Sequence, residues 1–172
     1  MTTLIKKYND ARVYLINDAN MVQKMALSIL FAIILAIASQ IKIFLSFTPV
    51  PINLGTFAVC MAGMTLGGFW GFISVAIYML AAAVGLPVIA GANFLGATTG
   101  YIVGYSICAF ALGKWTEKSD IKKYSFIKTS AVLFIFQIAI IHICGMIGLY
   151  LWSVSIGSPY TLTEVIMKGT VP

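Results

Sequence analysis

The polar side chains best suited to bind a ligand lie in one glycine- and proline-rich segment of an otherwise apolar chain. From Gly85 to Tyr101 the sequence reads GLPVIAGANFLGATTGY. Asn93 can donate and accept hydrogen bonds and Thr98 carries a hydroxyl, while glycines such as Gly91 let the backbone approach a ligand closely. Because these groups are neutral, we expect them to bind a neutral polar group such as an amide or a urea. The alternative is that the glycines only permit tight turns and that Asn93 caps one of them.

A second group of polar residues flanks the loop 47–53, which reads FTPVPIN. Its prolines favour an extended path that can cover a ligand site. Asn53 is expected to cap the next helix, with a ligand contact as the alternative. Lys42 is expected to extend to the lipid headgroups, and the alternative is that it faces inward and binds a ligand carboxylate. Gln40 lies beside it at the end of the same helix.

These candidate residues lie in a chain that is built for lipid rather than water. The 71 residues between Lys42 and Lys114 include no Asp, Glu, Lys, Arg or His, and the whole chain is 60% hydrophobic and 9% charged. Globular proteins are about 25% charged. The segments 26–41 and 131–152 are apolar on nearly every face, whereas strands of a membrane barrel alternate apolar and polar residues. The sequence therefore predicts an integral membrane protein made of helices.

The length of 172 residues allows five or six spans of about 20 residues each. We predict an all-α bundle, a polytopic single domain over residues 1–172, in which segment 1–23 is cytoplasmic. The predicted spans cover residues 24–47, 53–66, 68–84, 98–115, 130–152 and 160–172. The sixth is expected to be incomplete, because thirteen residues are too few to cross the bilayer.

The distribution of basic residues predicts the orientation of the bundle. Nine lysines and arginines lie before the first span or between the fourth and the fifth, and only Lys42 lies near the loops on the other side. Because basic residues are retained in the cytoplasm, we expect a multi-pass protein of the plasma membrane with a cytoplasmic N-terminus. The net charge of +6 is therefore attributed to membrane topology and not to nucleic-acid binding.

The residue types that catalysis and ATP hydrolysis require are missing from the sequence. No GxxxxGK[ST] phosphate loop occurs, since Gly113 and Lys114 are followed by Trp115. No Asp or Glu lies in the first five predicted spans, and no metal-ligand spacing or cofactor motif is found. His142 is the only histidine, and Gln137 lies on the neighbouring face of the same predicted helix. Because His142 has no acidic partner there, we expect it to make a structural hydrogen bond rather than to act in catalysis. The chain is not expected to be an enzyme, and transport would draw its energy from a partner.

Four sequence features together resemble the BioY family of biotin transporters. They are the segment 32–40, then PVPI at 49–52, then GLPVIAG at 85–91, and the pattern Gly96-x-Thr98-x-Gly100-Tyr101. Proteins of this family are substrate-capture (S) components of energy-coupling factor (ECF) transporters. The likeness extends over residues 26–115 and is weaker beyond.

The resemblance implies a fold, a ligand and partners. It implies six helices and a biotin pocket near the outer face, closed by the loop after the first span, with Asn93 bonded to the ureido ring. It also implies that Ala32 and Ala36 face a transmembrane coupling protein, which two cytoplasmic ATPase subunits drive. The substrate-binding set predicted from the motifs and the resemblance is Asn93, Gly91, Thr98, Tyr101, Gln40, Asn53 and Lys42.

Some positions depart from the family pattern. Where the family reads PVPITLQT, Asn53 and Gly55 replace the Thr and the Gln. The family's Asp and Lys that follow a Gly-x-x-Pro-Phe stretch are not reached before Pro172. Two alternatives therefore stand beside the biotin S component: an S component for another vitamin, and an intramembrane enzyme that uses His142 and a hydroxyl.

Overall fold

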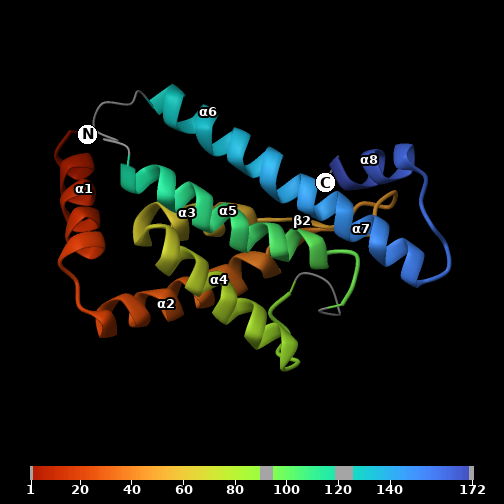
Figure 1. The fold of residues 1–172 in the computed structure, drawn as a ribbon, viewed down its shortest axis with the longest axis horizontal. Helices are drawn as coiled ribbons and strands as arrows, with labels where there is room; N and C mark the ends of the chain where they lie inside the picture. Colours follow the sequence, from red (N-terminus) through yellow and green to blue (C-terminus); the bar gives the residue numbers. More distant parts are fainter. Residues whose placement is uncertain (1, 90–94, 119–125, 171–172) are drawn as a thin grey trace.

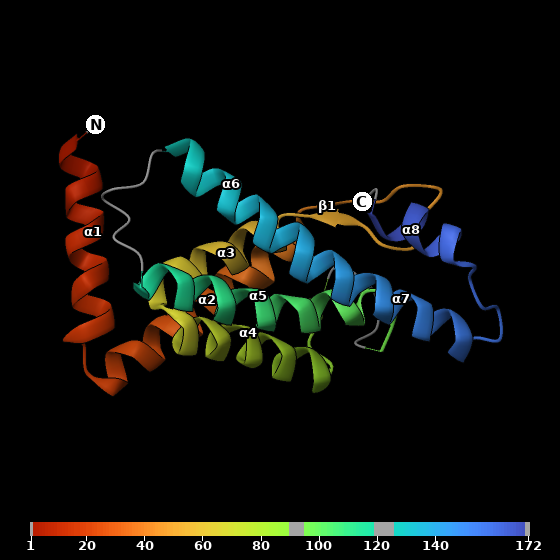
Figure 2. The same ribbon diagram turned by 45° about the horizontal axis from the view of Figure 1, so that its top comes forward.

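The structure is a computed structural model that describes residues 2–89, 95–118 and 126–170 (Figure 1). Its elements follow one another as α1 (Thr2–Asn17), α2 (Met21–Gln40), β1 (Lys42–Ile43), β2 (Ile52–Asn53), α3 (Gly55–Leu66), α4 (Gly68–Ala83), α5 (Thr99–Lys118), α6 (Phe126–Phe136), η2 (Gln137–His142), α7 (Ile143–Ser155) and α8 (Leu162–Thr170). The π-helical segment η2 joins α6 and α7 into one long helix that crosses the bundle (Figures 1 and 2).

Helix α2 begins at a capping box and ends earlier than predicted. The Asn20 side chain accepts a hydrogen bond from the Gln23 amide at 2.8 Å, and the Gln23 side chain accepts one from the Asn20 amide at 3.1 Å. The predicted span ran to residue 47, but the helix stops at Gln40. The chain then turns into extended backbone, in which Lys42 pairs with Asn53 in the short antiparallel β1–β2 ladder. This ladder, rather than the prolines, ends the helix.

Helices α3 and α4 match the predicted ranges to within two residues, and a glycine turn joins them. Gly67 has φ +83°, a left-handed conformation that favours glycine. A Cβ on Gly63 would meet the Ala109 carbonyl oxygen at 2.6 Å, and one on Gly71 would meet the Gly63 Cα at 2.8 Å. The small residues thus allow α3, α4 and α5 to pack closely.

Helix α5 lies at the centre of the bundle and packs against α3, α4, η2 and α7. Its contact with α7 is made through glycine, since a Cβ on Gly100 or on Gly148 would overlap the backbone of the other. One turn further along α5, a Cβ on Gly104 would meet the Ile141 Cα at 3.0 Å. These contacts fix an antiparallel register between α5 and the helix that contains η2.

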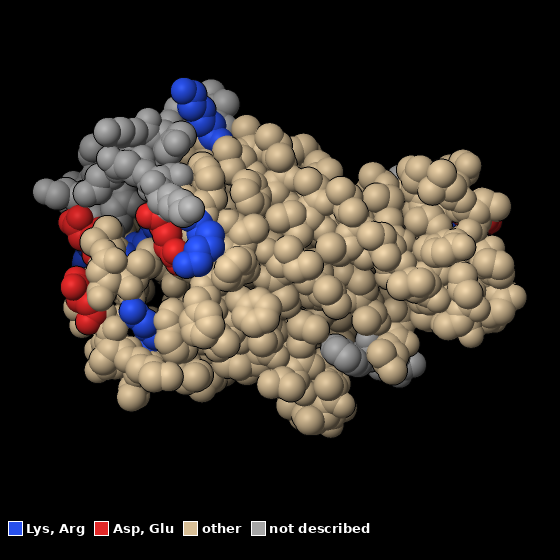
Figure 3. Space-filling view, in the orientation of Figure 1, with Lys and Arg blue, Asp and Glu red and all other residues tan. Residues whose placement is uncertain are grey.

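Helix α1 lies across one end of the bundle, in a segment for which only a cytoplasmic location was predicted (Figures 1 and 2). The Arg12 guanidinium donates to the Met64 carbonyl at 2.6 Å, and the Tyr8 hydroxyl is 3.2 Å from the Thr65 hydroxyl. Charged side chains gather at this end, and the visible middle of the molecule is uncharged (Figure 3). The charge distribution therefore agrees with the pattern on which the orientation was predicted.

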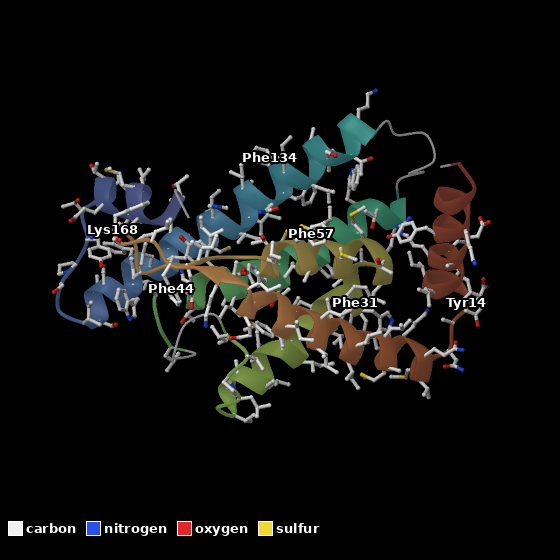
Figure 4. The ribbon with its side chains drawn as sticks, turned by 180° about the vertical axis from the view of Figure 1, so that it is seen from behind. Tyr14, Phe31, Phe44, Phe57, Phe134 and Lys168 are labelled. Atoms are coloured by element: carbon white, nitrogen blue, oxygen red, sulfur yellow. The ribbon has the colours of Figure 1, made fainter. Side chains whose placement is uncertain are left out.

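The sides of the bundle expose large apolar side chains. Phe57 and Phe134 are 63% and 64% exposed, whereas Phe31 is buried (Figure 4). By length and composition, two helices within the described residues can cross a membrane, namely Met21–Gln40 and the continuous helix Lys128–Ser155. The apolar helices Gly55–Leu66 and Gly68–Ala83 are shorter. A mostly helical bundle with lipid-compatible sides is present, and the predicted count of six transmembrane helices stays a proposal.

We predict that Gly148→Ala destabilises the bundle by about 1–3 kcal/mol, because the added methyl group forces α5 and α7 apart. Thermal unfolding in detergent measures the effect as a lower Tm. The control is Ala131→Leu, which adds more volume at an exposed position of the same long helix and should leave Tm nearly unchanged. An unchanged Tm in Gly148→Ala would show that this close contact is not required.

We also predict a contribution of Glu117 to stability that is lost in acid. Partial burial alone would raise the pKa of Glu117, but hydrogen bonds from Lys114 at 2.8 Å and from the Gly68 amide at 2.7 Å lower it below its ordinary 4.5. A lowered pKa in the folded state gives stability that is complete above 4.5 and disappears as the pH falls through the folded-state pKa. Glu117→Gln should remove this part of the acid-induced fall in Tm.

The matched control for this titration is Asp18→Asn, which changes an exposed carboxylate outside the Glu117 contacts. This variant should keep the pH dependence of the wild-type protein. If Glu117→Gln and wild type lose stability in parallel below pH 4.5, Glu117 does not carry the effect.

Candidate functional site

One cavity is lined by residues of α2, α4, α5, the β1–β2 loop and the long helix. In the ribbon view these segments come together toward the end of the bundle away from α1 (Figure 2). We name this cavity the tyrosine cavity. It is lined by Ser39, Val50, Pro51, Ile52, Asn53, Thr56, Tyr78, Ile89, Thr98, Tyr101, Ile102, Tyr105, Gln137, Ile141 and His142. Its volume of about 120 Å³ is roughly ten times what one water molecule needs, so it can hold a small organic ligand.

Two hydrogen-bonded pairs form much of the polar wall. The Tyr105 hydroxyl donates to Asn53 Oδ1 at 3.3 Å, and the same oxygen accepts from the Gly55 amide at 2.7 Å. The Tyr78 hydroxyl lies 3.2 Å from the Ser39 hydroxyl. These bonds fix the orientation of four side chains on three different helices and the β2 strand. The cavity wall is therefore ordered before any ligand binds.

The wall of the tyrosine cavity is neutral. Among the residues that the structure describes along it, none is Asp, Glu, Lys or Arg. Apolar side chains such as Val50, Ile89 and Ile102 complete the wall between the polar groups. Such a wall suits a ligand part that is apolar with a few uncharged hydrogen-bonding groups, since an unpaired charge would lose its hydration there.

Helix α8 is hydrogen-bonded both to the loop 44–51 and to α5. The Thr48 hydroxyl donates to the Lys168 carbonyl at 2.6 Å, and the Tyr101 hydroxyl donates to the Gly169 carbonyl at 2.7 Å. Lys168 itself points to the Tyr160 ring, with Nζ 3.8 Å from the ring centroid (Figure 4). Helix α8 thus contributes backbone acceptors that hold the loop and Tyr101 in place.

The predicted binding residues divide into three groups. Asn53, Thr98 and Tyr101 line the tyrosine cavity. Gln40 does not line it, because its amide donates to the Pro87 and Val88 carbonyls at 3.2 and 3.0 Å. Two predicted residues, Gly91 and Asn93, lie outside the part of the chain that the structure describes.

Lys42 also lies away from the cavity lining. Its ammonium group is 5.6 Å from the Phe44 ring centroid and 3.5 Å from Gln40 Oε1. This partly exposed position agrees with the expected extension toward the headgroups. Neither contact is with a residue of the cavity lining, so a contact of Lys42 with a ligand carboxylate stays a prediction.

Asn53 is not the N-cap that was predicted, because the N-cap of α3 is Leu54, which makes no side-chain cap hydrogen bond. The Asn53 side chain instead accepts from the amide of Gly55, the first residue of α3, two residues further on. Asn53 also lines the cavity, so its side chain supports the start of α3 and remains a candidate ligand contact.

Sequence reasoning missed several residues of the wall. Tyr105 follows Tyr101 by four residues on α5, so the helical period could have placed both on one face. His142 was assigned a structural hydrogen bond, but its Nδ1 is buried and has no hydrogen-bond partner among the described residues. Gln137 and His142 both line the cavity and are the first and last residues of the π-helical segment η2. No sequence pattern predicted a π-helix at this position.

The two alanines predicted to face a partner lie at different depths. Ala32 is 5% exposed and belongs to the hydrophobic core, whereas Ala36 is partly buried beside it. Ser28 lies on the same face of α2, four residues before Ala32, and its hydroxyl donates to the Trp70 carbonyl at 3.2 Å. This part of α2 packs against the chain's own α4, so Ala36 is the more accessible of the two alanines.

The described residues contain no group of three or more His, Cys, Asp or Glu side chains that could hold a metal ion. The polar groups of the tyrosine cavity are hydroxyls, amides and one imidazole. They can bind and orient a ligand through hydrogen bonds.

The fold and the tyrosine cavity define the class: a small helical bundle with lipid-compatible sides and a neutral ligand cavity at one end. The sequence model of the BioY family matches residues 7–172. The chain therefore belongs to the BioY family, as the sequence motifs predicted.

Curated relatives cover part of the chain. A probable biotin transporter BioY from Pyrococcus horikoshii is 38% identical over 96 residues, which are 53% of this chain and 58% of the relative. The biotin transporter BioY from Rhizobium etli is 41% identical over 100 residues, or 55% and 54% of the two chains. The matched part is thus a little over half the length of these relatives. Their names are those of transporters, which agrees with the expectation that the chain is not an enzyme.

A solved structure is similar over most of the chain. The S-component for biotin from an ECF-type ABC transporter matches with a TM-score of 0.73 and 27% identity, covering 87% of this chain and 80% of the other. The helices predicted from the sequence thus assemble into a known S-component architecture.

We predict that Asn53→Ala destabilises the protein by about 1–3 kcal/mol, because the Gly55 amide and the Tyr105 hydroxyl lose their shared acceptor. A double-mutant cycle with Tyr105→Phe measures the coupling. Tyr105→Phe should lower Tm less in the Asn53→Ala background than in wild type. Equal effects in both backgrounds would mean that the two side chains do not interact.

Proposed function

We propose that this chain is the biotin-binding S component of an ATP-driven ECF uptake transporter in the plasma membrane. The observation that carries the proposal is the match, over 87% of the chain, to a structure described as the S-component for biotin. Family membership over residues 7–172 points in the same direction.

The chemistry of the tyrosine cavity supports this ligand. Biotin carries a neutral cyclic urea on an apolar bicyclic ring, and only its side chain ends in a charge. The neutral wall, with hydroxyl and amide groups between aliphatic side chains, is complementary to the bicyclic part. The carboxylate then belongs toward the mouth of the cavity, where water can reach it.

Individual binding residues follow from their positions. Asn53, Thr98 and Tyr101 contact the ligand from the cavity wall. Asn93 and Gly91 are proposed as further ligand contacts on the basis of the sequence alone. Gln40 acts indirectly, by holding the backbone at Pro87 and Val88. Lys42 attracts the ligand carboxylate near the mouth.

The proposed topology has six transmembrane helices, with the N-terminus and α1 on the cytoplasmic side. Arg12 on α1 lies near Glu117, which is paired with Lys114, whereas the tyrosine cavity is lined by residues toward the opposite end of the bundle. This arrangement opens the cavity to the outside for capture of the vitamin.

The energy for uptake comes from partner proteins in this proposal. Gly113 and Lys114 precede Trp115 rather than the Ser or Thr of a phosphate loop. A transmembrane coupling protein contacts α2 near Ala36, with Ala32 behind it, and two ATPase subunits drive the cycle. The function of these alanines as a partner interface stays a prediction.

We predict that the purified protein binds biotin saturably in detergent, and that Asn93→Ala weakens binding about tenfold through loss of a ligand hydrogen bond. Isothermal titration calorimetry measures both. Asn17→Ala, an exposed change at the end of α1, is the matched control and should bind like wild type. Unchanged affinity in Asn93→Ala would remove this residue from the site.

The same titration distinguishes biotin from other vitamins. An excess of thiamine, riboflavin or folate should leave biotin binding unchanged. Binding of one of these instead of biotin would make the chain an S component for that vitamin and would overturn the proposed ligand.

A further inference from the structure

The π-helical segment η2 brings two polar side chains to the tyrosine cavity that a regular helix would separate. Gln137 and His142 are five residues apart, and an α-helix turns about 100° per residue, so they would point about 140° apart. A π-helix has i→i+5 hydrogen bonds and therefore brings such a pair close to the same side. Both side chains line the cavity. Single π-helical turns inside α-helices are frequent at functional sites.

The contact with α5 shows where this pair lies. Tyr101 lies against Gly145, and Gly104 lies against Ile141. The two helices are therefore antiparallel, and residues that come earlier in the long helix contact turns that come later in α5. The His142 ring packs edge-on against Tyr101, with centroids 6.3 Å apart. Gln137 lies more than a turn deeper into the bundle. The pair thus forms a polar strip that runs from Tyr101 toward the deep end of the cavity.

These two side chains differ from the hydrogen-bonded tyrosine and asparagine groups of the wall. The hydroxyls of Tyr78 and Tyr105 and the Asn53 amide oxygen have protein partners. His142 Nδ1 is buried without one. Gln137 is only partly buried, and the described residues include no hydrogen-bond partner for its side chain. Because buried polar groups in proteins almost always find partners, His142 Nδ1 is available to a ligand, and the Gln137 amide at the same cavity can bind the ligand beside it.

We infer that Gln137 and His142 bind the neutral urea of the ligand at the deep end of the tyrosine cavity and help to determine specificity. A neutral imidazole has one donor and one acceptor nitrogen, and the glutamine amide has both kinds of group. Together they match the N–H and C=O groups of a cyclic urea. None of the described residues of the wall is Lys or Arg, so the same place lacks the usual partners of a ligand carboxylate. The inference rests on the proposed function.

The first test uses the fact that the chain has one histidine. In protein labelled with ¹⁵N-histidine, all imidazole signals belong to His142. Saturation with biotin should shift the Nδ1 signal strongly. If biotin does not bind, the proposed function fails, and the same spectrum is recorded with the vitamin that does bind. An Nδ1 signal that stays in place on saturation with the ligand overturns the role of His142.

The second test separates ligand binding from a structural role. His142→Phe keeps the ring packing on Tyr101 and removes Nδ1, and Gln137→Leu removes the amide at similar volume. Each should weaken biotin binding about tenfold, as expected for one lost hydrogen bond, without lowering the Tm of the ligand-free protein. His142→Asn retains a polar group near Nδ1 and should bind more tightly than His142→Phe. Loss of affinity with a lower ligand-free Tm and no rescue by Asn would assign a structural role and contradict the inference.

Ligand analogues test which group is bound. 2-Iminobiotin has an imino group in place of the urea oxygen and is expected to bind wild type more weakly than biotin does. The ratio of the two affinities should be closer to one in His142→Phe and Gln137→Leu. Biotin methyl ester keeps the urea and lacks the carboxylate charge, so its relative affinity should be the same in wild type and both variants. If the variants instead change the ratio of the affinities for biotin and its methyl ester, Gln137 and His142 bind the carboxylate and the inference is wrong.

Discussion

The close contact of α5 with its neighbours is the constraint on which the rest of the structure depends. Gly100 and Gly148 bring two backbones together where any side chain would overlap, and Gly63 does the same between α3 and α5. In lipid, where apolar surface gives no drive for association, such packing is a main source of helix–helix attraction. The register that it imposes sets Tyr101 and Tyr105 opposite η2. The tyrosine cavity is the space that remains between them.

The missing charge inside the bundle connects stability with function. The described wall of the tyrosine cavity has no Asp, Glu, Lys or Arg, so its buried polar groups bond to one another, as Tyr105 does with Asn53 and Tyr78 with Ser39. Groups left without a protein partner, such as His142 Nδ1, then mark where a ligand completes the hydrogen bonding. Many of the charged groups gather at the end near α1, where the Glu117 carboxylate accepts from the Gly68 amide at the start of α4.

Much of this architecture could be predicted from the sequence, because glycine and proline mark helix ends and long apolar runs mark helices. The boundaries of α3 and α4 and the positions of Asn53, Thr98 and Tyr101 at the cavity followed from such local signals. The early end of α2 did not, because it depends on the pairing of Lys42 with Asn53. The place of Gln137 and His142 could not be predicted either, since an α-helical period separates them and only a π-helix brings them together.

The central claim is that the tyrosine cavity captures biotin. A structure of the purified protein determined with saturating biotin tests it most directly. The account predicts ligand density among Asn53, Tyr101, Tyr105 and His142, with the bicyclic ring inside and the carboxylate toward the mouth. Biotin density elsewhere on the protein, with this cavity empty, would contradict the account.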